Sequence, residues 1–238
     1  MARGATLRQL ISDLRDELRR LNTPSAAPDD TPSLRRTINH VYRLIYYQHD
    51  WSFLRYRFPA ITLNAGQRYY DVPAGLDADR ILEAKVKWSG DFVDVHRGIS
   101  TDDYNVHDPE ENERSSPMLK WDIVFTGTKE QIEVWPLPDG TAQSLRLYGV
   151  YACDPLVSED DICRLESEVI VLYAAAELLK AQKSEDAEAK LQQANELLRL
   201  VKIRSASAGE NTGTFRLGLG VSDDSSRPHP RATVRISG

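Results

Sequence analysis

The hydrophobic period of this chain changes at residues 51–54, and this change constrains the fold more than any other feature. Before it, Thr31 as N-cap and Pro32 at the first helical position predict the start of a helix. The apolar residues of that helix recur at spacings of three and four and are Leu34, Ile38, Val41 and Ile45. After it, the apolar spacing becomes two, which indicates β-strands. The chain therefore combines a helical part with a β part.

Three large apolar side chains stand where the period changes. They are Trp51, Phe53 and Leu54. An exposed linker rarely carries such residues, so we predict that they form a buried structural junction between the two parts. Further on, apolar residues flank the turn 64–67, with one run at 56–63 and another at 69–73. This pattern predicts a β-hairpin with a glycine-containing loop.

The same stretch resembles the head-to-tail adaptor (connector) proteins of tailed bacteriophages. A helix ends in Asp-Trp-x-Phe-Leu, and the motifs Leu-x-Ala-Gly-Gln and Tyr-Asp-Val-Pro follow it. These motifs consist of Asp50, Trp51, Phe53, Leu54, Leu63, Ala65, Gly66, Gln67, Tyr70, Asp71, Val72 and Pro73. The resemblance extends to residues 132–138 and 151–156 and covers most of residues 5–205. Its motifs are structural, so they identify a fold and a role rather than a site.

The resemblance implies a structural protein of the virion, located in the neck between capsid and tail and assembled in the host cytoplasm. It implies a ring, typically of twelve subunits, that sits under the portal and extends the DNA channel. The helical bundle would face the portal protein and the β domain the tail nozzle or another tail component. Duplex DNA would pass through the ring without specific binding. Another neck protein, such as a stopper or a tail terminator, is the alternative within this class.

Four helices are predicted to frame the β part. Thr6 and Gln9 are placed to form a capping box at the start of the first helix. Ser158, followed by the carboxylates of residues 159–161, predicts the start of the third helix, and Ser184 predicts the start of the fourth. The residues expected to be buried by the third helix are Ile162, Leu165, Val169, Leu172, Tyr173, Ala176 and Leu179.

Short strands separated by turns fill the middle of the chain. They are predicted at residues 80–88, 92–96, 119–125, 131–135 and 144–151, and Ser100 is expected to cap a short helix among them. This spacing is typical of an antiparallel sandwich or a small barrel. The predicted class is therefore α+β, a four-helix bundle frame interrupted by an all-β insertion. The predicted domains are residues 1–54 and 153–205 for the helices, 55–152 for the insertion and 206–238 for an extended C-terminal arm.

The net charge of −6 weighs against a protein that grips DNA, because phosphate binding normally needs a basic surface. A small DNA-binding regulator that uses Arg35, Arg36 and the arginines of the first helix is thus the alternative from a different class. The aromatic residues are expected to pack in the core rather than to stack on bases. They are Trp51, Phe53, Tyr56, Trp88, Trp121 and Trp135. No stretch is apolar enough to span a bilayer, so no membrane partner is expected.

No pattern in the sequence points to catalysis, a metal or a cofactor, and we predict a protein that is not an enzyme. The five histidines and two cysteines lack ligand spacing, and no nucleophile elbow or dinucleotide fingerprint occurs. The acidic run 108–113 lacks the alternating ligands and central glycine of a calcium loop, which favours a solvated loop. Cys153 and Cys163 are expected to be reduced thiols, although their positions also allow a disulfide.

Residues 206–238 are predicted to be a docking arm. They hold too little apolar surface to fold alone, and four apolar residues alternate with small or basic ones. Arginine pairs bidentately with partner carboxylates, and an extended arm covers a large surface. The expected partner-binding residues are Phe215, Arg216, Leu217, Leu219, Val221, Arg227, Arg231 and Arg235. The resemblance favours the portal as partner and a neighbouring subunit second; a plain disordered tail is the alternative.

Overall fold

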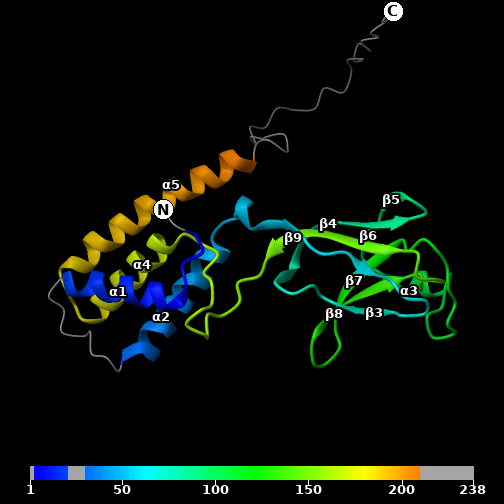
Figure 1. The fold of residues 1–238 in the computed structure, drawn as a ribbon, viewed down its shortest axis with the longest axis horizontal. Helices are drawn as coiled ribbons and strands as arrows, with labels where there is room; N and C mark the ends of the chain where they lie inside the picture. Colours follow the sequence, from blue (N-terminus) through cyan, green and yellow to red (C-terminus); the bar gives the residue numbers. More distant parts are fainter. Residues whose placement is uncertain (1–2, 21–29, 210–238) are drawn as a thin grey trace, which may run out of the picture.

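Helices and strands occupy opposite ends of an elongated molecule. The structure is a computed structural model and describes residues 3–20 and 30–209. One end holds α1 (Leu7–Arg20), α2 (Thr31–Tyr47), α4 (Ser167–Ala181) and α5 (Asp186–Gly209). The other end holds the strands and the short helix α3 (Thr101–Tyr104), as Figure 1 shows. This arrangement confirms the predicted α+β class.

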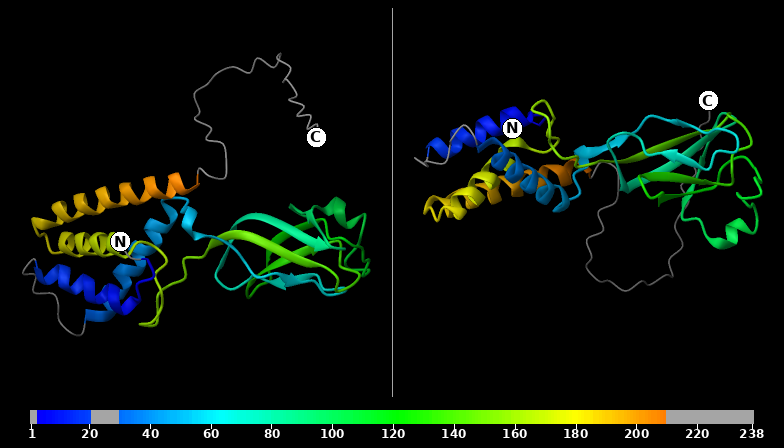
Figure 2. Two further views of the ribbon diagram at one scale, coloured as in Figure 1. Left: turned by 45° about the horizontal axis from the view of Figure 1, so that its top comes forward. Right: turned by 90° about the horizontal axis from the view of Figure 1, so that it is seen from below.

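Helix α4 is the centre of the helical half. It lies between α5 on one side and α1 and α2 on the other (Figure 2). Its small residues Ala174 and Ala175 are fully buried, which lets its neighbours approach closely. The four positions that predicted the apolar face of α2, beginning with Leu34, are all buried in the same core. The helical half therefore has one continuous core, which also includes Trp51, Leu54 and Val150 from the junction.

The predicted helix starts were correct for α1 and shifted for α2. The Gln9 amide donates to Thr6 Oγ1 at 3.3 Å and the Thr6 amide donates to Gln9 Oε1 at 2.9 Å, so the predicted capping box is present. Thr31, predicted as N-cap, is instead the first residue of α2, and Asp30 occupies the N-cap. The Thr31 hydroxyl accepts a hydrogen bond from Arg15 Nη2 at 2.7 Å, so it connects α2 to α1.

The third helix was predicted at Ser158, which is wrong, because α4 begins at Ser167. The Asp161 side chain accepts hydrogen bonds from the Val157 and Ser158 amides, and this closes a turn rather than starting a helix. Ile162, predicted to be buried in that helix, is 58% exposed. A serine followed three residues later by a carboxylate satisfies the same amides in a turn as at a helix start, so the motif alone does not distinguish them.

Residues 159–166 pair with the N-terminal segment instead of forming a helix. The Gly4 amide donates to Cys163 O at 3.1 Å, and the Cys163 amide donates to Ala5 O at 2.9 Å. The amides of Leu7 and Arg8 donate to carbonyls of the same segment. The first amides of α1, which have no partner within the helix, are satisfied in this way.

The β half is a sandwich of two sheets around a second core. The first sheet has the order β1 (Arg55–Arg57), β9 (Ser144–Tyr151), β4 (Leu76–Trp88) and β5 (Asp91–Asp94), with β2 (Ile61–Thr62) also paired to β9. The second has the order β3 (Tyr69–Asp71), β8 (Glu130–Trp135), β7 (Lys120–Phe125) and β6 (His96–Arg97). Both sheets contribute side chains to the core, among them Val86, Leu145, Trp121 and Ile132.

The predicted hairpin around residues 64–67 is wrong. Strand β2 before the turn pairs with β9, whereas β3 after it pairs with β8 in the other sheet. The turn is held by other contacts: the Gly66 amide donates to Pro138 O at 2.8 Å, and the Asn64 amide donates to the Tyr70 hydroxyl at 2.8 Å. Gly66 has a φ of +70°, which suits glycine. The turn is thus a corner of the sandwich.

Of two smaller predictions, the cap of the short helix was correct and the strand direction was partly wrong. Ser100 does cap α3, in a capping box with Asp103. The sandwich is not wholly antiparallel, however, since β6 pairs with β7 in parallel. The two-residue length of β6 gave no periodicity from which its direction could be predicted.

Candidate functional site

The junction between the two halves is built around the indole of Trp51. Trp51 is 1% exposed, and its Nε1 donates to the Ile45 carbonyl at 3.2 Å, near the end of α2. Its ring centre lies 4.8 Å from that of His49 and 5.6 Å from that of Phe53. Leu54 is buried beside it at the end of the 3-10 helix η2 (Ser52–Leu54), whereas Phe53 is half-buried. The three residues predicted for the junction therefore lie together at the base of the helical half.

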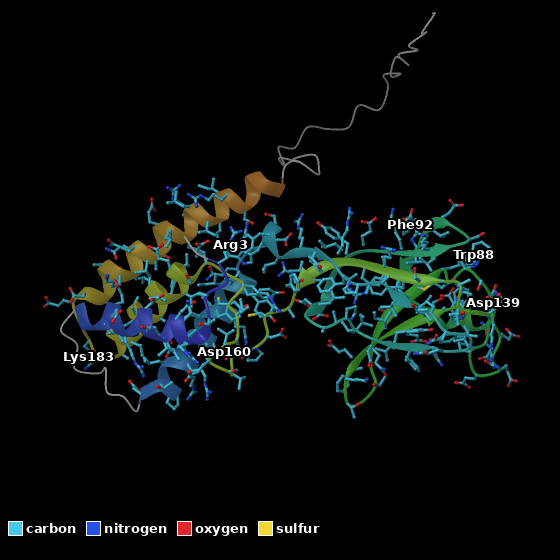
Figure 3. The ribbon with its side chains drawn as sticks, in the orientation of Figure 1. Arg3, Trp88, Phe92, Asp139, Asp160 and Lys183 are labelled. Atoms are coloured by element: carbon cyan, nitrogen blue, oxygen red, sulfur yellow. The ribbon has the colours of Figure 1, made fainter. Side chains whose placement is uncertain are left out.

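Segments far apart in sequence meet at this junction. The Arg3 guanidinium lies 3.6 Å from the Phe53 ring centre and 3.5 Å from a Glu166 carboxylate oxygen. The Ser52 hydroxyl donates to the Ser205 carbonyl at 2.7 Å, and the Ser52 amide donates to Ser205 Oγ at 2.9 Å. The N-terminal segment and the last turns of α5 are thus attached to the chain between the halves; Figure 3 labels Arg3 at this place.

A polar clamp connects the last turn of α2 to the sandwich. The Tyr46 hydroxyl donates to Asp77 Oδ2 at 2.6 Å and lies 3.0 Å from the Tyr151 carbonyl. Asp50 pairs with Arg55 at 2.7 Å and with Arg80 at 2.9 Å. Burial, and secondarily the hydrogen bond to Asp77, raises the pKa of Tyr46 well above its usual value, so the hydroxyl keeps its proton. Together with Trp51, the clamp makes the connection between the halves well packed.

A groove with acidic walls runs along the helical half. It is an open hollow of about 670 Å³ between α1, α4 and α5. Its apolar lining residues are Val171, Leu172, Leu197 and Leu200, and its acidic ones are Asp13, Asp16, Glu17, Glu168 and Glu196. Lys190 pairs with Glu17 at its edge, and Arg199 pairs with Glu196 at 3.0 Å. We call this surface the acidic groove.

The outer face of the five-stranded sheet combines cations with exposed aromatic rings. Lys87 and Arg146 lie 6.0 Å and 5.5 Å from the ring centre of Phe92, which is 54% exposed. Trp88, the last residue of β4, is 37% exposed, and both rings lie at the end of the molecule farthest from the helices (Figure 3). Trp88 and Tyr56, which is 46% exposed, are therefore not core residues as predicted.

The cysteines and the metal-binding residue types of the described part form neither an activated thiol nor a metal site. Both cysteines are free thiols, and burial raises the pKa of each to about 12, so neither is a nucleophile at neutral pH. Within residues 3–20 and 30–209, no group of three His, Cys, Asp or Glu side chains is placed to hold a metal ion. No helix in the described part of the chain has the length and apolarity needed to cross a membrane.

The docking arm lies largely outside the described residues. This includes all eight of its predicted contact residues, Phe215, Arg216, Leu217, Leu219, Val221, Arg227, Arg231 and Arg235. Its first four residues, 206–209, belong to α5, so the helix extends past the predicted boundary at Ser205. Sequence reasoning also missed the clamp and the acidic groove. The clamp gave no local signal, because the Tyr46 hydroxyl donates to Asp77, a residue of the β half.

A comparison with protein families identifies the class of this molecule. Residues 5–216 match the family described as SU10 adaptor protein, so the match covers both the helices and the sandwich. The fold and this match define a bacteriophage adaptor protein, a structural component of the virion. The chain belongs to the SU10 adaptor protein family. A comparison with curated proteins gave no match.

Proposed function

We propose that this protein is the head-to-tail adaptor of a phage, forming a ring under the portal that extends the DNA channel and joins the capsid to the tail. The observation that carries the proposal is the family match over residues 5–216, which includes both halves of the molecule. Its partners are further copies of itself, in a ring of twelve, the portal protein and a tail component. It acts in the neck of the virion after assembly in the host cytoplasm.

The geometry suits a protein that connects two larger structures. The helical half and the sandwich each have their own core, and the junction of Trp51 and the clamp connects them by packed and paired side chains. The two ends present different surfaces, one helical and acidic, the other a sheet with cations and aromatic rings. Contacts between unlike surfaces of identical subunits can close into a ring.

The alternative of a DNA-binding regulator gains no support from the described surfaces. The cations of the outer sheet face stand among carboxylates, since Lys85 pairs with Glu83 at 3.1 Å and with Asp94 at 3.2 Å. Arg35, expected to contact DNA in that alternative, donates to the Val157 carbonyl at 3.2 Å. A stopper or a tail terminator would share the class, but the family match is to an adaptor.

Electron cryo-microscopy of the purified full-length protein, with and without its portal protein, tests the proposal. We expect a ring on the portal with a central hole wide enough for duplex DNA. A protein that remains a compact monomer in the presence of the portal would contradict the adaptor role. A ring that binds the tail end but never the portal would favour a stopper or terminator instead.

A further inference from the structure

The acidic groove is an open surface with a defined chemistry. Its floor is apolar, and Leu200 at its edge is 41% exposed. The lining residues include five carboxylates and, among the described residues, no lysine or arginine. Within that described part, Asp13 and Glu168 have neither a hydrogen-bond nor an ion-pair partner, and both are exposed. A ligand that fits must therefore present apolar side chains together with positive charge.

The C-terminal sequence of the chain has this composition. Residues 215–238 contain four arginines and two aspartates, so the side chains of the segment carry a net charge of +2. Its apolar residues alternate with others at Phe215, Leu217, Leu219 and Val221. In an extended segment this alternation places the four apolar side chains on one side. We propose that these residues bind in the acidic groove of a second copy of the chain.

The direction of α5 favours a neighbouring groove over the chain's own. Gly209 is twelve residues beyond Leu197, which places the end of the helix about 18 Å past the middle of the groove. Residues 210–214 span at most about 18 Å when fully extended, so Phe215 reaches the middle of the chain's own groove only through an immediate, fully stretched reversal along α5. A neighbouring groove imposes no such reversal when it lies ahead of the end of α5, within the roughly 20 Å that separates Phe215 from Gly209 in a fully extended chain.

This contact deepens the proposed function and rests on it, since a ring is what supplies the neighbouring groove. An arm that leaves one subunit and binds a different surface of the next makes a heterologous contact, which repeats around a ring until it closes. The apolar floor supplies burial and the carboxylate walls supply pairing for arginine, which binds carboxylates through two parallel hydrogen bonds.

Cysteine cross-linking between full-length chains tests the contact. One preparation carries Leu200→Cys in the groove and a second carries Leu217→Cys in the arm. Leu44→Cys on α2 is the matched control, because Leu44 is 44% exposed and lies outside the acidic groove. The chain with Leu217→Cys is mixed with each of the other two under mild oxidation. We expect its disulfide with the Leu200→Cys chain to form at least about tenfold faster than its disulfide with the Leu44→Cys chain, because binding raises the effective concentration of the thiols. The native thiols, of which Cys163 is buried and Cys153 half-buried, have raised pKa values and should contribute little.

Charge reversal gives a second readout of the same contact. Asp13→Lys with Glu168→Lys should slow the cross-link at Leu200→Cys and leave that at Leu44→Cys unchanged. Equal rates at the two positions would overturn the proposal. So would a disulfide that forms only within a single chain carrying both Leu200→Cys and Leu217→Cys, since the arm would then bind its own groove. A ring on the portal without the cross-link would refute this contact alone and leave the adaptor role standing.

Discussion

The indole of Trp51 shows how a single side chain connects distant parts of the chain. It fills the space between the end of α2 and η2, and the Ile45 carbonyl accepts its only polar hydrogen. The core around it includes Val150 from β9 and Val201 from α5. The loss of this ring would therefore leave a cavity where the two connections to the sandwich leave the helices.

We predict that Trp51→Ala lowers the free energy of unfolding by about 3–5 kcal/mol, the range for a buried large aromatic side chain. Trp88→Ala is the control, because Trp88 is 37% exposed and its removal should cost less than about 1 kcal/mol. Chemical denaturation of both variants measures the difference. Equal, small losses would show that Trp51 is not a structural junction.

The two thiols give a prediction that depends on pH. Burial raises the pKa of Cys153 and Cys163 from 9.0 to about 12, so the folded protein should react with a thiol reagent at pH 8 far more slowly than the unfolded protein. Because the unfolded thiols ionise first, these groups stabilise the fold fully below pH 9, and this contribution is lost as the pH rises to 12. Rapid reaction of both thiols under native conditions would contradict this burial.

For single residues, the sequence predicted which side chains are apolar enough to be buried. It did not always predict which of them are buried in the structure. The helical positions of α2 were correct because a regular helix turns one face to the core. The predicted burial of Trp88 and Tyr56 was wrong. Strand alternation assigns residues to the two faces of a sheet but does not tell which face is covered. That information comes from the partner sheet, which lies far away in the sequence.

Among the elements, the segment 159–166 is the clearest case of long-range contacts deciding local structure. Ser158 and the carboxylates that follow it are typical of a helix start, yet the backbone of the segment pairs with residues 3–8. Similarly, the turn at residues 64–67 has the composition of a hairpin loop, yet it joins two different sheets. Local motifs predicted that the chain turns at these places, and contacts from distant residues decided what the turn connects.

The clamp between α2 and the sandwich gives a prediction at the element scale. Tyr46→Phe removes the hydroxyl that donates to Asp77 at 2.6 Å and should cost about 1.5–3 kcal/mol, as for a hydrogen bond to a charged group. Tyr47→Phe is the matched control on the next residue, where the side chain is 71% exposed, and should have almost no effect. Denaturation monitored by circular dichroism compares the two; identical midpoints would mean that the clamp adds nothing to stability.

For the whole molecule, the sequence predicted the class and the order of the parts, because periodicity and motifs are local. The acidic groove could not be predicted from the sequence, because the walls of the groove come from three helices, α1, α4 and α5. Only their packing places Asp13 beside Glu168 and Leu200. The apolar residues of α5 that line it have the same helical spacing as core residues. The contact residues of the docking arm lie outside the described residues and remain a prediction.

The overall charge gives a prediction for DNA. A chain with a net charge of −6 that forms the proposed DNA channel should bind duplex DNA more weakly than about 100 µM at physiological salt and with little dependence on salt. Fluorescence anisotropy of the isolated protein measures this, and reversal of the exposed cation in Arg146→Glu should change it little. Sub-micromolar binding that is lost on adding salt would instead support the DNA-binding regulator.

The pairing of β1 with β9 determines how the molecule responds to tension. Both connections between the halves leave the sandwich at the same end, since Arg55 pairs with Val150 and Leu76 with Tyr151. A pull that separates the halves therefore draws β1 and β9 in the same direction along their own axes, and the long strand β4 holds β9 on its other side. The hydrogen bonds of an antiparallel pair lie perpendicular to the strands, so they are loaded in shear and share the force instead of unzipping one by one. Tension between the two halves is therefore carried by the pairing of β9 with β4.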